Sequence, residues 1–173
     1  MLDIAALTHH HTLTDGRSLV TRPLLPEDAA LYPEFIASVT QEDLRLTFFA
    51  AIKELSEERI AQLTRIDFTR AMAFIALDEA DGKMLGVVRL HLEPDGKSGE
   101  YAVMVRSGLK GHGLGWMLMQ RMIDYARIIG LKDVYGQVLA ENTTMLRMCA
   151  ELGFDIREDM TSKSTKVVTL KLP

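Results

Sequence analysis

Cysteine, proline and aromatic residues are scarce in this chain of 173 residues, which has one cysteine, Cys149, five prolines and 6% aromatic residues. A single cysteine excludes an internal disulfide and a zinc site built from several cysteines, and it is compatible with the reducing cytosol. No apolar run approaches the roughly 20 residues that span a bilayer. Residues Met1 to His11 lack the basic and then apolar pattern of a secretory signal. We therefore expect a cytoplasmic protein with no membrane partner.

The chain also has no excess of positive charge. Lysine and arginine number 20 against 24 aspartates and glutamates, which gives a formal net charge of −4. Proteins that bind nucleic acid usually carry a basic excess or a basic stripe, because contacts with phosphates dominate their affinity. We therefore expect no nucleic-acid partner. The 47% apolar and 25% charged residues are typical of a globular protein, and the length fits one domain.

The first 16 residues, Met1 to Gly16, contain no apolar pattern typical of a packed element. We expect a disordered tail over residues 1–16, dispensable for stability, followed by a single domain over residues 17–173. Three consecutive histidines, His9, His10 and His11, lie in this segment. Adjacent side chains point in different directions on a helix or a strand, so these three cannot easily converge on one ion. No metal is expected.

Downstream, the residue pattern predicts an α/β (α+β mixed) fold with a central, mostly antiparallel sheet flanked by helices. Three short apolar runs separated by tight turns predict an antiparallel meander. The expected strands cover residues 18–23, 72–77, 84–92, 99–106, 133–140, 154–157 and 166–172. The expected helices cover residues 26–39, 56–64, 113–129 and 142–152.

Four glycines, Gly108, Gly111, Gly113 and Gly115, lie between the last strand of the meander and a long amphipathic helix. Glycine allows positive φ angles and a close approach of the backbone to a ligand. The first turn of a helix offers free N–H groups and the positive end of the helix dipole. This segment, to which Lys110 adds a donor, predicts a site for a phosphate or a diphosphate.

Two common phosphate-binding motifs do not fit this segment. A Walker A loop requires lysine after its last glycine, but Leu114 follows Gly113. A dinucleotide fingerprint that starts at Gly111 requires glycine where Trp116 stands. That fingerprint also belongs to a parallel βαβ unit, whereas this strand follows two predicted hairpins.

A third pattern, [Arg/Gln]-x-x-Gly-x-[Gly/Ala], fits with lysine at its first position. In this respect the chain resembles the GNAT N-acetyltransferase superfamily, in which such a loop binds the diphosphate of acetyl-CoA. Asn142 at the start of a later helix and Gly153-Phe154 after its end match the superfamily too. The resemblance implies acetyl-CoA as cosubstrate and no metal. The cofactor-binding residues that it implies are Val103, Met104, Val105, Lys110, Gly111, His112, Gly113, Leu114, Gly115 and Asn142.

Several segments resemble more narrowly the catalytic domain of Pat-type bacterial protein lysine acetyltransferases. These segments are EDLRLTFF (Glu42–Phe49), RIDFTRAMAFIAL (Arg65–Leu77), GVVRL (Gly86–Leu90), EYAVMVRSGLKGHGLG (Glu100–Gly115) and LAENTTML (Leu139–Leu146). This resemblance implies a lysine acceptor on a protein, although Thr69 and Ala71 stand where family members often have acids. The alternatives are a small-amine acetyltransferase or a non-catalytic acyl-CoA-binding module. The acceptor groove is expected to involve the loop of residues 47–57, and the protein is expected to be a monomer or a homodimer.

Acetyl transfer to an amine requires a base, because a lysine amine with a pKa of about 10.4 is mostly protonated near neutral pH. Glu100, on the strand that leads into the glycine loop, is the candidate that the resemblance implies. Asp67 is a second candidate, for orienting the amine or tuning Glu100. Many GNAT enzymes have a tyrosine where this chain has Cys149, which we expect to pack as a small apolar residue. Two roles stay open for Asn142, capping its helix or contacting the pantetheine arm.

Overall fold

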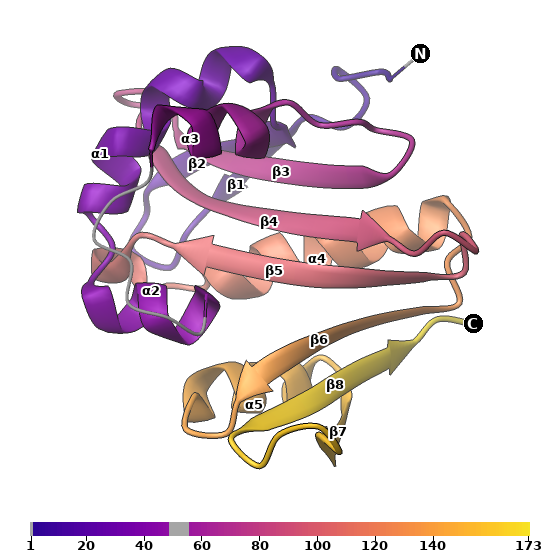
Figure 1. Cartoon of the computed structure of the whole chain (residues 1–173). Helices are drawn as coiled ribbons and strands as arrows, with labels where there is room; N and C mark the ends of the chain where they lie inside the picture. Colours follow the sequence, from indigo (N-terminus) through magenta and orange to yellow (C-terminus); the bar gives the residue numbers. More distant parts are fainter. Residues whose placement is uncertain (1, 49–55) are drawn as a thin grey trace.

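The computed structural model describes residues 2–48 and 56–173 and contains one eight-stranded sheet. The strand order is β1-β2-β3-β4-β5-β6-β8-β7. Neighbouring strands run antiparallel except β5 and β6, which are parallel. Helices flank the sheet, so the predicted mixed α/β fold with a mostly antiparallel sheet is confirmed (Figure 1).

The strands are β1 (His9–Thr12), β2 (Ser18–Pro23), β3 (Ala71–Asp78), β4 (Met84–Leu92), β5 (Ser98–Val105), β6 (Asp133–Leu139), β7 (Asp155–Glu158) and β8 (Thr165–Lys171). The α-helices are α1 (Tyr32–Ala37), α2 (Gln41–Phe48), α3 (Glu57–Thr64), α4 (Leu114–Ile128) and α5 (Thr143–Glu151). Two 3-10 helices, η1 (Pro26–Leu31) and η2 (Ser107–Leu109), complete the described elements. Among the described residues, none of the helices is both long and apolar enough to cross a membrane.

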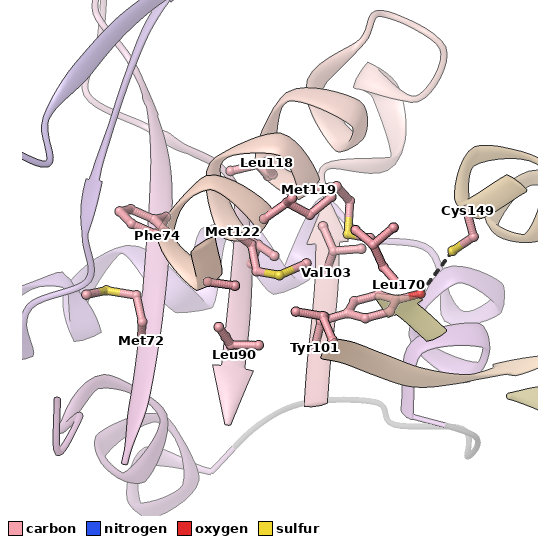
Figure 2. Close-up of a cluster of buried hydrophobic side chains, with 14 of the residues drawn as sticks. Met72, Phe74, Leu90, Tyr101, Val103, Leu118, Met119, Met122, Cys149 and Leu170 are labelled. Atoms are coloured by element: carbon pink, nitrogen blue, oxygen red, sulfur yellow. Dashed lines mark hydrogen bonds between the residues drawn. The ribbon is translucent and has the colours of Figure 1, made fainter. Parts of the chain in front are cut away.

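The two faces of the sheet carry separate apolar clusters. On one face, side chains of α4 such as Leu118 and Met122 pack on β3, β4 and β5, and the cluster continues to Cys149 of α5 (Figure 2). On the other face, α1 and its neighbours cover a cluster that includes Phe35 and Met104. The sheet is therefore a middle layer between two groups of helices, as Figure 1 shows.

The predicted helix over residues 26–39 is divided in the structure. A 3-10 helix covers Pro26–Leu31, and α1 starts anew at Tyr32. Pro33 accounts for the division, because proline has no N–H to donate to a preceding turn. Proline is well tolerated in the first turn of a new helix, which is its position in α1.

The prediction of a disordered tail over residues 1–16 is corrected by the structure. Residues His9–Thr12 form β1, which pairs antiparallel with β2. Leu13, in the turn between these strands, is buried with 6% of its surface exposed. Backbone hydrogen bonds hold β1 in place, and any residue except proline can make them, so the histidines gave no sign of a strand.

A buried arginine also ties the N-terminal segment to the core. The Arg121 side chain, on α4, donates hydrogen bonds to the Leu7 carbonyl oxygen over 2.7 Å and to the Thr21 hydroxyl over 3.2 Å. Its guanidinium lies 4.6 Å from the centre of the Phe74 ring. A buried arginine depends on such partners, because an unpaired polar group in the core is costly.

Deleting residues 1–16 should therefore destabilise the protein. The deletion removes the buried Leu13 side chain, worth about 2 kcal/mol, and a hydrogen-bond acceptor of Arg121. For a chain of this length, that loss corresponds to a decrease in Tm of about 4–8 °C. Thermal unfolding followed by circular dichroism measures it. A deletion of residues 1–3 keeps Leu7 and Leu13 and should cost much less, and equal Tm values for the two deletions would contradict this account.

Candidate active site

The glycine loop joins β5 to α4 through two residues with left-handed backbone. Gly111 has a φ of 87° and Gly113 a φ of 89°, a region that favours glycine. Gly113 is the N-cap of α4, and the first helical hydrogen bond runs from Met117 N–H to its carbonyl oxygen. The N–H groups of the first turn of α4 precede this bond and are free to bind an anion.

A cavity of about 320 Å³ opens beside this loop. Its walls come from the end of β5, the glycine loop, the start of α4, and helices α2 and α5. Apolar side chains dominate, among them Leu46, Trp116 and Met148, and the charged residues are Asp43, Lys110, Arg147 and Glu151. A mostly apolar cavity that also contains charged groups and the glycine loop suits a ligand that has an anionic part and an apolar arm.

The residues predicted to bind the cofactor mostly line this cavity. They are Val103, Met104, Val105, Lys110, Gly111, Gly113, Gly115 and Asn142. His112 and Leu114 are not among its lining residues. The His112 carbonyl oxygen accepts a hydrogen bond from the Thr14 hydroxyl over 3.2 Å, and Leu114 is buried in the core. Of the two roles left open for Asn142, the cap is confirmed, because its side chain accepts the Met145 N–H over 3.2 Å; the residue also lines the cavity.

Strands β5 and β6 separate next to this cavity. Their ladder contains three residue pairs and ends at Glu100 and Tyr135. A second cavity, of about 60 Å³, lies where they part, and Leu46, Val103 and Asn142 line both cavities. Beyond Glu100, the side of β5 that faces β6 has no strand partner, so its N–H groups can serve another acceptor.

A tyrosine and a glycine lie at the point of separation. The Tyr101 ring covers Gly136 so closely that a Cβ atom on Gly136 would come within 2.5 Å of it. The Tyr101 hydroxyl hydrogen-bonds to the Cys149 thiol over 3.2 Å (Figure 2). Burial raises the pKa of both groups, so both stay protonated near neutral pH. The prediction that Cys149 packs as a small buried residue is confirmed.

A carboxylate that sequence reasoning missed lies at the glycine loop. Asp43, on α2, accepts hydrogen bonds from Lys110 Nζ and from the Ser107 hydroxyl, each over 2.5 Å. Partial burial raises the pKa of Asp43, but these hydrogen bonds outweigh it and hold the pKa below its ordinary value. Asp43 and Lys110 are 67 positions apart, so no local motif signals this contact.

The two predicted catalytic acids lie outside both cavities. Glu100 is exposed on the sheet face that carries α1, in register with His91 of β4 and Tyr135 of β6. Asp67 lies in the turn before β3, where its carboxylate accepts the Thr69 N–H over 3.0 Å and the Thr69 hydroxyl over 2.6 Å. These bonds lower the pKa of Asp67. Among the described residues, the partners of the Asp67 carboxylate are Thr69 and Arg70, and no hydrogen bond joins it to Glu100.

Two further expectations concern the acceptor loop and metal binding. Residues 49–55 of the expected acceptor loop lie outside the described residues. Within residues 2–48 and 56–173, no group of three or more histidine, cysteine, aspartate or glutamate side chains could hold a metal ion.

The fold, the glycine loop and the cavity define an acetyltransferase of the GNAT class. The chain belongs to the Acetyltransferase (GNAT) family, whose model matches residues 37–154. It is 34% identical over 159 residues to acetyltransferase PA5475 of Pseudomonas aeruginosa, covering 91% of this chain and 85% of that protein. The chain is therefore an N-acetyltransferase.

Solved structures have the same fold. The GNAT domain of S. lividans PAT superimposes with a TM-score of 0.90 at 22% identity, over 99% of this chain and 100% of that domain. RimL, a ribosomal L7/L12 alpha-N-protein acetyltransferase solved in complex with coenzyme A, superimposes with a TM-score of 0.72 at 10% identity, over 89% and 94% of the two chains. GNAT enzymes use acetyl-CoA, which agrees with the anionic and apolar parts expected of the ligand.

Proposed function

We propose that this enzyme transfers the acetyl group of acetyl-CoA to the side-chain amine of a lysine in a protein. The observation that carries the proposal is the continuous lining shared by the two cavities, from the glycine loop to the separation of β5 and β6. The reducing cytoplasm is the compartment we propose, in keeping with the single cysteine.

The residues at the loop fit the diphosphate of acetyl-CoA. A Cβ atom on Gly111 or Gly113 would meet no other atom within 4 Å, so it would project into open space where a ligand can lie. The free N–H groups of the first turn of α4 and the Lys110 ammonium supply donors and positive charge. The apolar walls along Met145 and Met148 suit the pantetheine arm.

The exposed face around Glu100 supports a macromolecular acceptor. Glu100 and Ala102 are exposed, whereas Met104, two residues further along the same face, is buried under helices. Sites for small molecules usually enclose most of their ligand. An open sheet face next to the separation of β5 and β6 can instead admit a lysine side chain that a protein presents.

The reaction needs a proton acceptor and an oxyanion donor. The neutral amine nitrogen attacks the thioester carbonyl carbon, the C–N bond forms, and the C–S bond breaks to release coenzyme A. Glu100 takes the proton from the nitrogen and passes it to solvent or to the released sulfur. Glu100 precedes Val103 by three strand residues, about 10 Å, which is more than one water can bridge, so we assign it a role through a chain of ordered waters. An N–H group of residues 103–105 donates to the oxyanion.

The acceptor is tested by measuring release of free coenzyme A from acetyl-CoA with proteins, lysine peptides and small amines. Turnover with lysine-bearing proteins or peptides, together with mass-spectrometric detection of acetyl-lysine, is the expected result. Turnover with small amines alone would identify a small-amine acetyltransferase. Binding of acetyl-CoA with no turnover on any acceptor would support a non-catalytic acyl-CoA-binding module.

Replacing Gly113 should weaken acetyl-CoA binding. Gly113→Val places a side chain in the left-handed region and in the space proposed for the diphosphate, so affinity should fall about tenfold or more, equal to about 1.4 kcal/mol or more. Gly130→Val is the matched control, because Gly130 also has a positive φ and open surroundings but lies at the far end of α4. Titration calorimetry with acetyl-CoA should show normal affinity for the control. Equal affinities for both variants would contradict the loop assignment.

Replacing Glu100 should slow chemistry and leave cofactor binding intact. Glu100→Gln keeps the size of the side chain but cannot accept the proton, so kcat should fall by about 10²–10⁴-fold. Raising the pH should partly restore turnover, because more amine is then deprotonated without a base. Glu93→Gln, which removes a nearby carboxylate that accepts the Tyr135 hydroxyl, should stay close to wild type. If kcat of Glu100→Gln equals that of the wild type, Glu100 is not the proton acceptor. Asp67→Asn would then be the variant to measure.

A further inference from the structure

The Asp43 carboxylate is a negative group inside the cavity where the negative diphosphate is proposed to bind. Its side chain is only 15% exposed, against 45% for that of Lys110, to which it is bonded over 2.5 Å. Asp43 lines the cavity together with Lys110, Gly111 and Gly113. The cation of the glycine loop is thus already paired with an internal anion.

The start of α2 is built around this contact. The Thr40 hydroxyl accepts the Asp43 N–H over 3.1 Å, and the Thr40 N–H donates to the Ser107 hydroxyl over 2.9 Å. Ser107 in turn donates to the second Asp43 oxygen. Three groups of the loop and the helix thereby fix the carboxylate next to Lys110, so the pairing is part of the local fold rather than a chance surface contact.

The same helix is also bonded to the segment that leads into α5. Arg45 pairs with Glu141, which lies just before α5, and with Glu42 of its own helix. Leu46, one residue further, lines both cavities. Helix α2 lies beside the end of β5, where β5 and β6 diverge (Figure 1). Helix α2 therefore links the glycine loop to the segment that leads into α5.

Two like charges near one another are disfavoured, and most strongly where the site is partly shielded from water. A diphosphate at the glycine loop would place negative charge beside the Asp43 carboxylate. As long as Lys110 donates to Asp43, fewer of its three N–H donors and less of its positive charge are available to the phosphates. On the proposed acetyl-CoA site, we infer that Asp43 competes with the diphosphate for Lys110 and thereby lowers the affinity of the enzyme for acetyl-CoA.

The test is the acetyl-CoA affinity of Asp43→Asn. Trp116 is the only tryptophan of the chain and lines the cavity, so its fluorescence reports binding directly. At low ionic strength, where screening is weak, Asp43→Asn should bind acetyl-CoA about threefold or more tightly than wild type. Glu42→Gln is the matched control, since it removes the neighbouring carboxylate of the same helix, which bonds to Arg45 and not to Lys110. Its affinity should stay close to wild type.

Two further measurements identify the cause of the tighter binding. One uses a ligand without the diphosphate, and the other repeats the substitution in a protein that lacks the Lys110 charge. S-acetylpantetheine has the thioester and the arm but no diphosphate, so its affinity should be the same for wild type and Asp43→Asn. In a Lys110→Met background, the gain from Asp43→Asn should shrink. Weaker or unchanged acetyl-CoA binding by Asp43→Asn would overturn the inference, because Asp43 would then support Lys110 or have no role. Circular dichroism checks that the variant folds, and Asp43→Ala serves in its place if it does not.

The outcomes separate this inference from the proposed function. If wild type binds acetyl-CoA and Asp43→Asn binds it no more tightly, only the competition is overturned. If wild type binds neither acetyl-CoA nor S-acetylpantetheine, the acetyl-CoA site itself is wrong, and the competition fails with it.

Discussion

The early separation of β5 and β6 is the constraint on which the site depends. The two strands pair over three residues, and the next pair along the ladder would be Tyr101 with Gly136. There the Tyr101 ring lies over Gly136, so closely that even a methyl group on that glycine would clash. The strands diverge from this point, and the two cavities lie in and beside the opening. Without the divergence, β6 would occupy the hydrogen-bonding edge of β5 that the proposed mechanism uses.

Strand β5 connects the proposed oxyanion site to the proposed diphosphate site. Residues 103–105 at the end of β5 line the cavity, and the glycine loop follows within a few residues. A continuous stretch of backbone therefore leads from the proposed oxyanion donors to the free N–H groups of α4. Because both sets of N–H groups belong to one stretch of backbone, their spacing depends on the path of the main chain rather than on flexible side chains.

The parts of this structure that the sequence predicts are those with local signals. The glycines of the loop, the tight turns of the meander and the cap at Asn142 act over a few residues, and each is found where it was expected. A short-range rule also covers the division of the first predicted helix next to Pro33, although the division was not predicted.

Contacts between distant residues could not be predicted from sequence. Arg121 bonds to Leu7 across 114 positions, and Asp43 bonds to Lys110 across 67. Neither pair has a motif, since each depends on how the elements pack. β1 was missed for a different reason: its stability comes from the backbone ladder with β2 and from Leu13 beyond its end, not from alternation within His9–Thr12.

The buried Tyr101–Cys149 pair bears on which side of the thioester needs help with proton transfer. Burial keeps both groups protonated, and their mutual hydrogen bond already occupies them, so neither is poised to exchange a proton with a substrate. A thiol with a reference pKa of about 8.5 leaves as a thiolate at little cost near neutral pH, whereas an amine with a pKa of about 10.4 must first lose a proton. The energetic demand therefore lies on the acceptor side of the thioester. In the proposed mechanism, that side is the exposed face of β5 that carries Glu100, so an open and water-accessible face is compatible with the proposed chemistry.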